Sequence, residues 1–277
     1  MSLSVTAHQV ALAVNLPDLP DALLQRIIGH LLHLNAVRSV CLVACVCTAL
    51  QRAAHACLAM SRHLRPPAAN CKAALVALLP RLQSLTELDL SGSFRDVDDD
   101  VLAAVAASSA LTSLSLRSCT RITAAGIAAL GGGGLRNLQV LSLHSVRHID
   151  DLAALAGLPS LRDLDLSWCL HVRTHALPPL HRLHRLLLRG CELVDDSLCA
   201  GFDSDGSGPL PELVDLDLAY TRLGDGGLLA LAASCPRLRR LAVAQSEANL
   251  WSTGMWTEAG LREFARRRPE VRLELVC

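Results

Sequence analysis

The chain has 277 residues, of which 51% are apolar but only 3% are aromatic, so its core must be assembled from many small aliphatic side chains. Lys and Arg together number 26, and so do Asp and Glu, which leaves a formal charge of zero and no overall field that favours nucleic acid or an acidic membrane surface. This composition favours helical and repeat architectures.

The start of the chain lacks the marks of a targeting or membrane segment. Residues 1–15 form a tail with no Lys or Arg ahead of a weakly apolar stretch, which argues against a secretory signal. The longest apolar run lies between Arg38 and Arg52 and is much shorter than the roughly 20 residues that cross a bilayer. We therefore expect a cytoplasmic or nuclear protein outside membranes, whose 11 cysteines are reduced thiols.

Residues 16–58 are expected to form an all-helical module. Pro20 suits a first helical turn, and the aliphatic residues after it recur at three- and four-residue spacing along one face. A second run, from Val37 to Leu50, is too apolar to be a solvated helix. Because a module of about 40 residues is near the limit of independent stability, we expect it to pack on a partner or on the rest of the chain.

This segment resembles an F-box. The residues at matching positions are Leu19, Pro20, Leu23, Leu24, Ile27, Ile28, Leu31, Val46 and Cys47. The segment departs from the usual pattern at Ala22, where an acid is common, and at Leu50, where tryptophan is common. The resemblance implies that the matching residues, together with Leu50, bind a Skp-type adaptor. The residues alone leave open an N-terminal cap that shields the end of the next domain.

From residue 82 onward, a leucine motif with the pattern LxxLxL recurs seven times. The motifs start at Leu85, Leu111, Leu138, Leu161, Leu183, Leu213 and Leu238. The alternation within L-x-L predicts a short strand with one buried face, and the residues that follow, such as Ile122–Leu130, have helical spacing. Such units, stacked in parallel, predict an α/β solenoid over residues 82–277, and residues 59–81 are expected to be a linker helix or cap.

One small residue follows each predicted strand and is expected to turn inward, forming a ladder along the solenoid. These residues are Ser93, Cys119, Val146, Cys169, Cys191, Thr221 and Ser246. Their side chains can satisfy backbone groups at the bend. The cysteines among them are therefore predicted to be structural residues and not metal or redox sites.

Several segments depart from the regular repeat. Gly131–Gly134 is predicted to be a flexible turn and residues 201–211 a loop insertion, because neither glycine run has the Lys-Ser/Thr of a phosphate-binding loop. The acids within residues 96–100 come where a helix should begin, which suits the helix dipole and a solvated structural role. Residues 269–277 are expected to form a closing strand.

The repeats resemble the cysteine-containing subclass of leucine-rich repeats, whose fingerprint stands at Gly224–Leu228 and Ser234–Leu241. F-box proteins with leucine-rich repeats are substrate-recognition subunits of cullin-based SCF ubiquitin ligases. The resemblance implies that the N-terminal module binds the Skp-type adaptor and that the repeats, about seven in number, bind a target protein. Other subunits would then transfer ubiquitin.

Two other classes of function stay open, a scaffold without any ligase and a hydrolase or metalloenzyme. His171 with His175, and His181 with His184, have spacings that a metal could use, but no acid or cysteine completes a tetrahedral set nearby. The common hydrolase motifs GxSxG and HExxH do not occur. We therefore expect no catalysis, no cofactor and no metal.

The free face of the strands is the expected binding surface. Its charges alternate in sign between units, so Asp165 with Arg185, or Arg189 with Asp217, is expected to pair across neighbouring strands, each exposed pair contributing about 0–1 kcal/mol. Aromatic and arginine side chains are common anchors of protein interfaces. The predicted target-binding residues are Arg117, His144, Trp168, Arg189 and Tyr220. A deep enclosed pocket is not expected from so short an arc.

Overall fold

The computed structural model of the chain describes residues 23, 25–26, 62–66, 72–173, 177–199, 210–244 and 256–276. In the F-box-like segment this includes Leu23, which is helical and exposed. The other residues predicted to bind the adaptor lie outside the described residues. They are Leu19, Pro20, Leu24, Ile27, Ile28, Leu31, Val46, Cys47 and Leu50.

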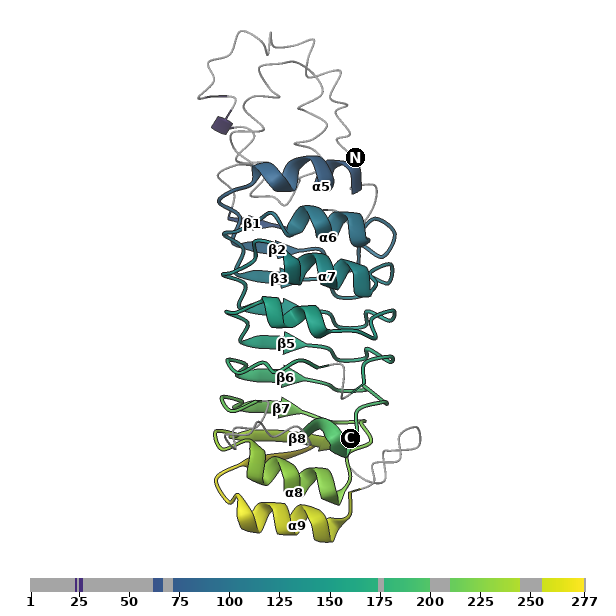
Figure 1. Cartoon of the computed structure of the whole chain (residues 1–277), viewed down its shortest axis with the longest axis vertical. Coiled ribbons are helices and arrows are strands. Elements are labelled where there is room, and N and C mark those ends of the chain that lie inside the picture. The colour runs from purple at the N-terminus through teal and green to yellow at the C-terminus, as the bar shows by residue number, and fades with distance from the viewer. Residues whose placement is uncertain are drawn as a thin grey trace, which may run out of the picture.

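Nine strands form one parallel sheet and follow one another in chain order (Figure 1). They are β1 (His63–Leu64), β2 (Glu87–Asp89), β3 (Ser113–Ser115), β4 (Val140–Ser142), β5 (Asp163–Asp165), β6 (Arg185–Leu187), β7 (Asp215–Asp217), β8 (Arg240–Ala244) and β9 (Arg272–Val276). The seven leucine motifs supply β2 to β8, and β9 is the predicted closing strand. The α/β solenoid predicted from the sequence is therefore confirmed, but its sheet already begins at β1, within residues 59–81 that were predicted to be a linker helix or cap.

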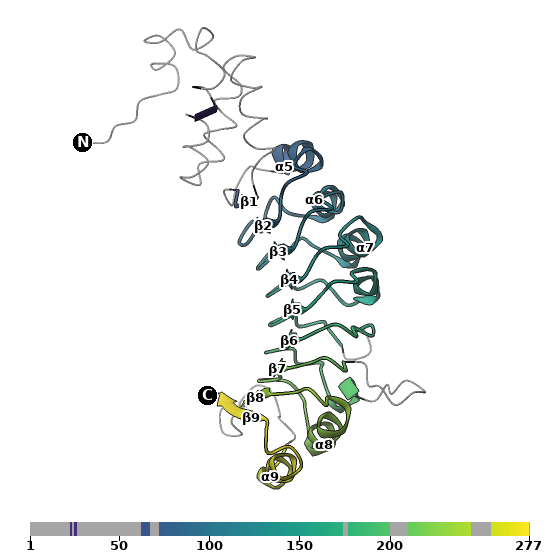
Figure 2. The same ribbon diagram turned by 90° about the vertical axis from the view of Figure 1, so that its left-hand side faces the viewer.

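The strands line the inner, concave side of a gentle arc and the helices line its outer side (Figure 2). The described helices are α5 (Lys72–Leu78), η2 (Leu79–Arg81), α6 (Asp99–Val105), α7 (Ala124–Gly132), η3 (Ala153–Gly157), η5 (Asp196–Cys199), α8 (Asp225–Ser234) and α9 (Glu258–Arg267). The unit that starts at Leu138 is short and carries a 3₁₀ helix in place of an α-helix. Among these elements, no helix is both long enough and apolar enough to span a bilayer.

The core is a continuous stack of leucines. The two apolar residues of every L-x-L motif, from Leu88 and Leu90 to Leu241 and Val243, are at most 2% exposed. Each central leucine is aligned with the central leucines of the neighbouring strands. Burial of one such side chain stabilises the fold by about 1.5–3 kcal/mol, so each unit depends on its neighbours for most of its stability.

The cysteines after the strands turn inward as predicted. Cys119, Cys169 and Cys191 are fully buried. Each thiol donates a hydrogen bond of 3.1–3.2 Å to the carbonyl oxygen of the last strand leucine in the preceding unit. The thiols thus satisfy carbonyls at the bend that would otherwise be buried without a partner. Ser246, the last predicted residue of this ladder, lies outside the described residues.

The predicted turn at Gly131–Gly134 is correct only for its second half, Gly133 and Gly134. Gly131 and Gly132 belong to the last turn of α7. A Cβ on Gly131 would lie 1.9 Å from the carbonyl oxygen of Ala154, and a Cβ on Gly157 would lie 2.1 Å from the carbonyl oxygen of Gly131. Glycine is required here because the backbones of adjacent units touch, and not because the turn needs freedom.

The acids at the start of α6 connect units as well as facing the helix dipole. The carboxylate of Asp99 accepts hydrogen bonds from the backbone amide and the hydroxyl of Thr123, at 2.9 and 2.6 Å. Asp98 pairs with Lys72, and its side chain is only 13% exposed, so the predicted solvated role is wrong for this residue. At the other end of the solenoid, the carboxylate of Asp225 likewise accepts hydrogen bonds from the backbone amide and the hydroxyl of Thr257.

A buried arginine joins the last unit to the rest. Through its two terminal nitrogens, Arg268 donates hydrogen bonds of 2.8–3.3 Å to four carbonyl oxygens between Ala232 and Leu238, at and beyond the end of α8. Its Nε contacts Glu270 at 2.6 Å, and its side chain is 10% exposed. A positive charge at the C-terminal end of a helix also complements the helix dipole. Arg268 therefore holds α9 against α8.

Replacement of Arg268 by methionine should detach the last unit. We expect Arg268→Met to lower the free energy of unfolding by about 2–4 kcal/mol, because several buried carbonyls lose a charged donor. Arg267→Met is the matched control, since Arg267 is half-exposed and, among the described residues, pairs with Glu263 on its own helix, and it should cost less than about 1 kcal/mol. Urea unfolding measures both changes. Equal losses in the two variants would contradict this role.

The buried thiols should be unreactive in the folded chain. Burial raises the pKa of the Cys191 thiol to about 12, and burial also raises the pKa of Cys169. Because the thiolate is the reactive form, iodoacetamide at about pH 8 should leave both residues unmodified in the native protein and label them in urea. Mass spectrometry of tryptic peptides reads the result. Rapid native labelling of either residue would contradict its structural assignment.

Candidate functional site

The five predicted target-binding residues lie in two adjacent rows at the ends of strands β3 to β7. The inner row contains Arg117, His144, Ser167, Arg189 and Ala219. The outer row contains Ser118, Ser145, Trp168, Gly190 and Tyr220. Backbone hydrogen bonds link the rows, because the outer-row amides of β3 to β6 donate to the inner-row carbonyls of the next unit. The structure therefore brings the predicted residues onto one edge of the concave face.

The outer row has left-handed backbone geometry. Its φ angles are 59° at Ser118, 58° at Ser145, 62° at Trp168, 71° at Gly190 and 59° at Tyr220. This conformation costs a residue with a Cβ about 1–2 kcal/mol, and glycine avoids the cost. Local preference therefore does not explain a tryptophan and a tyrosine in this row. The same conformation recurs at Gly92 in the preceding unit, so the repeat imposes it, and Trp168 and Tyr220 are distinguished by their size.

Trp168 and Tyr220 form an aromatic pair across Gly190. Their ring centroids lie 6.2 Å apart with an angle of 27° between the ring planes. The indole covers Gly190, where a Cβ would lie 2.5 Å from the ring. Trp168 is nevertheless 43% exposed. The pair thus presents a large apolar surface to solvent beside the concave face.

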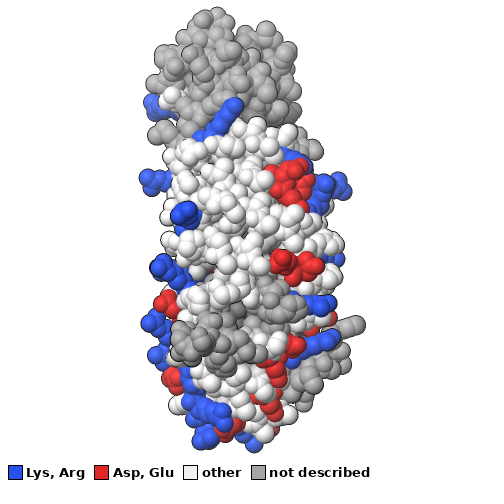
Figure 3. Space-filling view, viewed as in Figure 1, with Lys and Arg blue, Asp and Glu red and all other residues white. Residues whose placement is uncertain are grey.

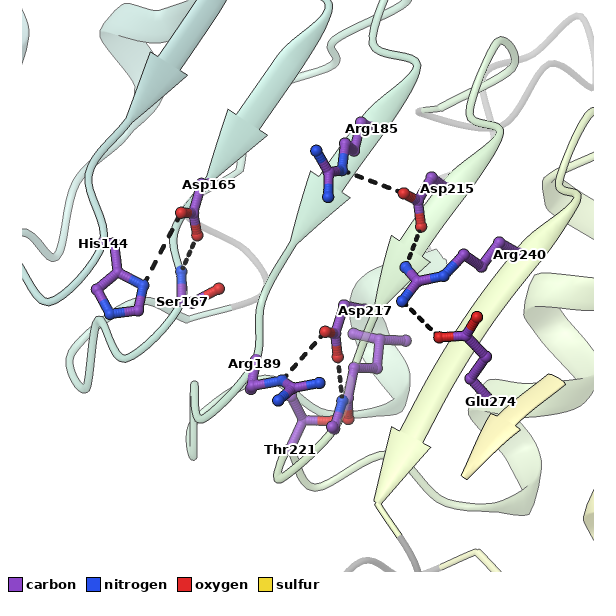
Figure 4. A network of polar contacts seen from close by, with 12 residues as sticks. His144, Asp165, Ser167, Arg185, Arg189, Asp215, Asp217, Thr221, Arg240 and Glu274 are labelled. Atoms are coloured by element: carbon purple, nitrogen blue, oxygen red, sulfur yellow. Dashed lines mark hydrogen bonds and ion pairs between the residues drawn. The ribbon is translucent and has the colours of Figure 1, made fainter. Parts of the chain in front are cut away.

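Arg189 is fixed by Asp217, as predicted. The guanidinium Nε lies 3.1 Å from the carboxylate (Figure 4). Asp217 is only 7% exposed and also accepts a hydrogen bond from the amide of Ala219 at 3.0 Å. Asp217 therefore neutralises the charge of Arg189. The ion pair explains Arg189 as a residue that positions the end of β6, without any bound target.

The other predicted pair, Asp165 with Arg185, does not form. Arg185 lies 3.1 Å from Asp215, which also contacts Arg240 at 2.6 Å, and Arg240 continues the chain of ion pairs to Glu274 (Figure 4). The reason is register. Arg185 is aligned with Asp163 and Asp215, whereas Asp165 is aligned with Leu187.

His144 is the ionisable neighbour of Asp165. The two side chains approach to 3.8 Å, and the His144 side chain is 24% exposed. Burial lowers the pKa of His144, and the nearby Arg117 guanidinium acts in the same direction, against the opposing effect of Asp165. The lowered pKa favours the neutral imidazole over the imidazolium that would compensate the charge of Asp165.

Arg117 is the exposed cation of the predicted set. No ion pair within 4 Å joins it to another part of the chain that the structure describes. The strands beside it carry hydroxyls, and the Oγ atoms of Ser91 and Ser115 lie 2.8 Å apart. This end of the concave face is therefore polar and weakly charged.

An open cleft of about 290 Å³ adjoins Ser113 and Ser115 at the N-terminal end of the same face. Its charged groups are already matched. His63 lies 2.8 Å from Glu87, and Arg65 lies 3.3 Å from Asp89.

The described residues contain no grouping of three or more His, Cys, Asp or Glu side chains that could hold a metal ion. His171 stacks on His148 with ring centroids 6.4 Å apart. His175, its predicted companion, lies outside the described residues.

The face that bears the helices is free of charged side chains over much of its middle, with charges towards its margins (Figure 3). The concave face therefore remains the candidate site.

Gly190 and Asp165 belong to this site although they were absent from the predicted contact set. Gly190 could have been found from the strand register, which places it between Trp168 and Tyr220. No sequence signal indicated Asp165, because the sequence does not show that Arg185 pairs with Asp215 instead of with Asp165.

Comparison with known proteins supports the fold. A leucine-rich-repeat family model matches residues 107–131 and 211–232. Among curated proteins, no sequence matches the chain. Together with the nine-stranded parallel sheet, the family match shows that the chain contains leucine-rich repeats.

Three solved structures are similar in fold. One is the Rad7–Elc1 complex in yeast, at 18% identity and a TM-score of 0.54 over 81% of this chain and 57% of that chain. The TLR13–ssRNA13 complex has 19% identity and a TM-score of 0.50, over 79% of this chain and 33% of that chain. An internalin, inlF, of Listeria monocytogenes has 17% identity and a TM-score of 0.51, over 81% of this chain and 63% of that chain. The chain thus spans less than two thirds of each. At these identities the likeness is one of fold, and the fold is a leucine-rich-repeat solenoid.

Proposed function

We propose that the chain is the F-box-type substrate-recognition subunit of a cullin-based SCF ubiquitin ligase. Its N-terminal segment binds a Skp-type adaptor and its concave face binds a target protein. The chain itself catalyses nothing and works in the cytoplasm or nucleus. Support for the first contact comes from the F-box resemblance of residues 16–58, and support for the second from the site at the ends of β3 to β7.

The observation that carries target binding is the Trp168–Tyr220 pair. Both residues adopt a conformation that disfavours bulky side chains, and Trp168 stays 43% exposed in a chain with only 3% aromatic residues. A parallel sheet with a continuous leucine core holds them in place. Rigidly held, exposed aromatic side chains are common interface anchors, since their burial against a partner removes much apolar surface from water.

The fold is compatible with macromolecular partners. The similar yeast structure is a complex of Rad7 with the protein Elc1, and the similar TLR13 structure is a complex with ssRNA13. We favour a protein target for this chain because its formal charge is zero and because most of the described arginines on the concave face are paired with carboxylates. The alternative is a leucine-rich-repeat scaffold or regulator that binds a protein without any ligase.

Binding to the adaptor separates the two functions. The full chain should co-elute with a Skp-type adaptor in size-exclusion chromatography, and Leu23→Asp combined with Ile27→Asp should abolish the complex, because two charges enter the apolar contact. Phe94→Asp combined with Leu170→Asp is the matched control, since both residues are exposed on the solenoid. The control should still bind. Circular dichroism should show the same folded solenoid in all variants.

Two outcomes contradict the ligase role. One is that the wild-type chain does not form the complex, and the other is that the Leu23→Asp, Ile27→Asp variant binds as well as the control. Either result favours the scaffold.

A further inference from the structure

The carboxylates of the concave face differ in whether they have a cationic partner. Most do, including Asp215 and Asp217 on β7, which pair with arginines. On β5 the situation is different. Within the described residues, Asp163 has no ion pair within 4 Å, and Asp165 has only His144. Strand β5 therefore carries two carboxylates that lack a Lys or Arg partner among the described residues.

Asp165 is held in one orientation. Its Oδ1 accepts a hydrogen bond from the amide of Ser167 at 3.0 Å, and its Oδ2 accepts one from the hydroxyl of Ser142 at 3.2 Å. Its side chain is 18% exposed. These donors are neutral, and the burial of His144 lowers its pKa, which favours the neutral imidazole. The carboxylate is thus positioned but not neutralised, which favours an external cation.

Apolar side chains lie next to both acids. Val140 on β4 is aligned with Asp163 and is 38% exposed. Leu187 on β6 is aligned with Asp165 and is partly exposed. Lysine and arginine have a long aliphatic stem and a charged head group, so this alternation of apolar and acidic surface matches both parts of such a side chain.

The aromatic pair extends the same surface. Trp168 follows Asp165 by three residues, at the end of the same strand, and its indole is exposed. Indole faces attract lysine and arginine head groups through the ring quadrupole, and tryptophan does so more strongly than the other aromatic residues. Acidic, apolar and aromatic groups therefore converge on one class of ligand.

We propose that Val140, Asp163, Asp165, Trp168, Leu187 and Tyr220 form a docking surface for a lysine- or arginine-containing segment of the target protein. This inference rests on the proposed function, in which the concave face binds a protein. The chain's own arginines should not strongly repel such a cationic segment. Arg185, aligned with Asp163, is engaged by Asp215, and Arg117 lies two strands away, about 10 Å along the sheet.

Synthetic peptides test the charge preference directly. Three fluorescent peptides, identical except for lysine, glutamine or glutamate at every second position, are titrated with the full chain at near-physiological salt, and fluorescence anisotropy reports binding. Alternate positions are chosen because Asp163 and Asp165 lie about 7 Å apart along one strand. The lysine peptide should bind at least about tenfold more tightly than the glutamine peptide, and the glutamate peptide should bind most weakly.

Substitution of the two aspartates of β5 by asparagine tests their contribution to binding. Asp163→Asn with Asp165→Asn should weaken the lysine peptide by about tenfold, because two contacts of opposite charge are lost while the amide oxygen that replaces the Asp165 carboxylate can still accept from Ser167. The matched control is Asp150→Asn with Asp151→Asn, an exposed pair of aspartates in which one carboxylate also accepts from the backbone, and it should bind like the wild type. Trp168→Ala should weaken binding by about fivefold.

Several results would overturn the inference. These are no binding of the lysine peptide, equal binding of the three peptides, or equal affinity of the Asp163→Asn, Asp165→Asn variant and its control. Tighter binding of a single-stranded oligonucleotide to the same surface would also overturn it. Failure here is distinguishable from failure of the ligase role, because the Asp163→Asn, Asp165→Asn variant keeps residues 16–58 intact and should still co-elute with the adaptor.

Discussion

The structure depends on one constraint, the alignment of leucines from unit to unit. A three-residue strand with a single buried side chain has no stability by itself, and it becomes stable only when the strands before and after it present leucines at the same height. The register keeps this alignment from β2 to β8. Once the leucines are aligned, every other position in the unit has an assigned direction, inward, outward or toward the bend.

Backbone polarity is the second demand that the repeat must meet. Each bend buries carbonyl oxygens, and the thiols of Cys119, Cys169 and Cys191 satisfy them from the following unit. On the helix side, carboxylates such as Asp99 and Asp225 accept from amides and hydroxyls of the next unit. Units are therefore joined at both ends by hydrogen bonds as well as by the leucine core between them.

Sequence reasoning succeeded where a residue's role follows from period alone. The strands, the leucine core and the inward cysteines each recur with the motif, so a count along the chain predicts them. It failed where the outcome depends on contacts between units. The glycines at Gly131 and Gly157 are explained by the approach of two backbones, and Arg268 by carbonyls that lie about 30 residues earlier in the chain. None of these partners can be identified from spacing.

In the candidate site, too, the repeat period predicted positions but not the contacts between units. The register brought Trp168 and Tyr220 together in one row, but their stacking across Gly190 could not be inferred without coordinates. The ion pairs of β6 to β9 neutralise most of the concave face, whereas the two carboxylates of β5 have no Lys or Arg partner among the described residues, and Asp165 has only His144 beside it. Selectivity on this face therefore comes from a few unmatched groups and not from its overall charge.

Adjacent leucines on strand β6 offer the most direct test of the central claim, because Leu186 is fully buried and Leu187 faces the concave side. Leu186→Ala should lower the free energy of unfolding by about 3–5 kcal/mol, whereas Leu187→Ala should cost less than about 1 kcal/mol. Urea denaturation of the two variants measures the difference. Equal losses, or a larger loss for Leu187→Ala, would contradict a solenoid in which the periodic leucines form the core and leave the other strand face open.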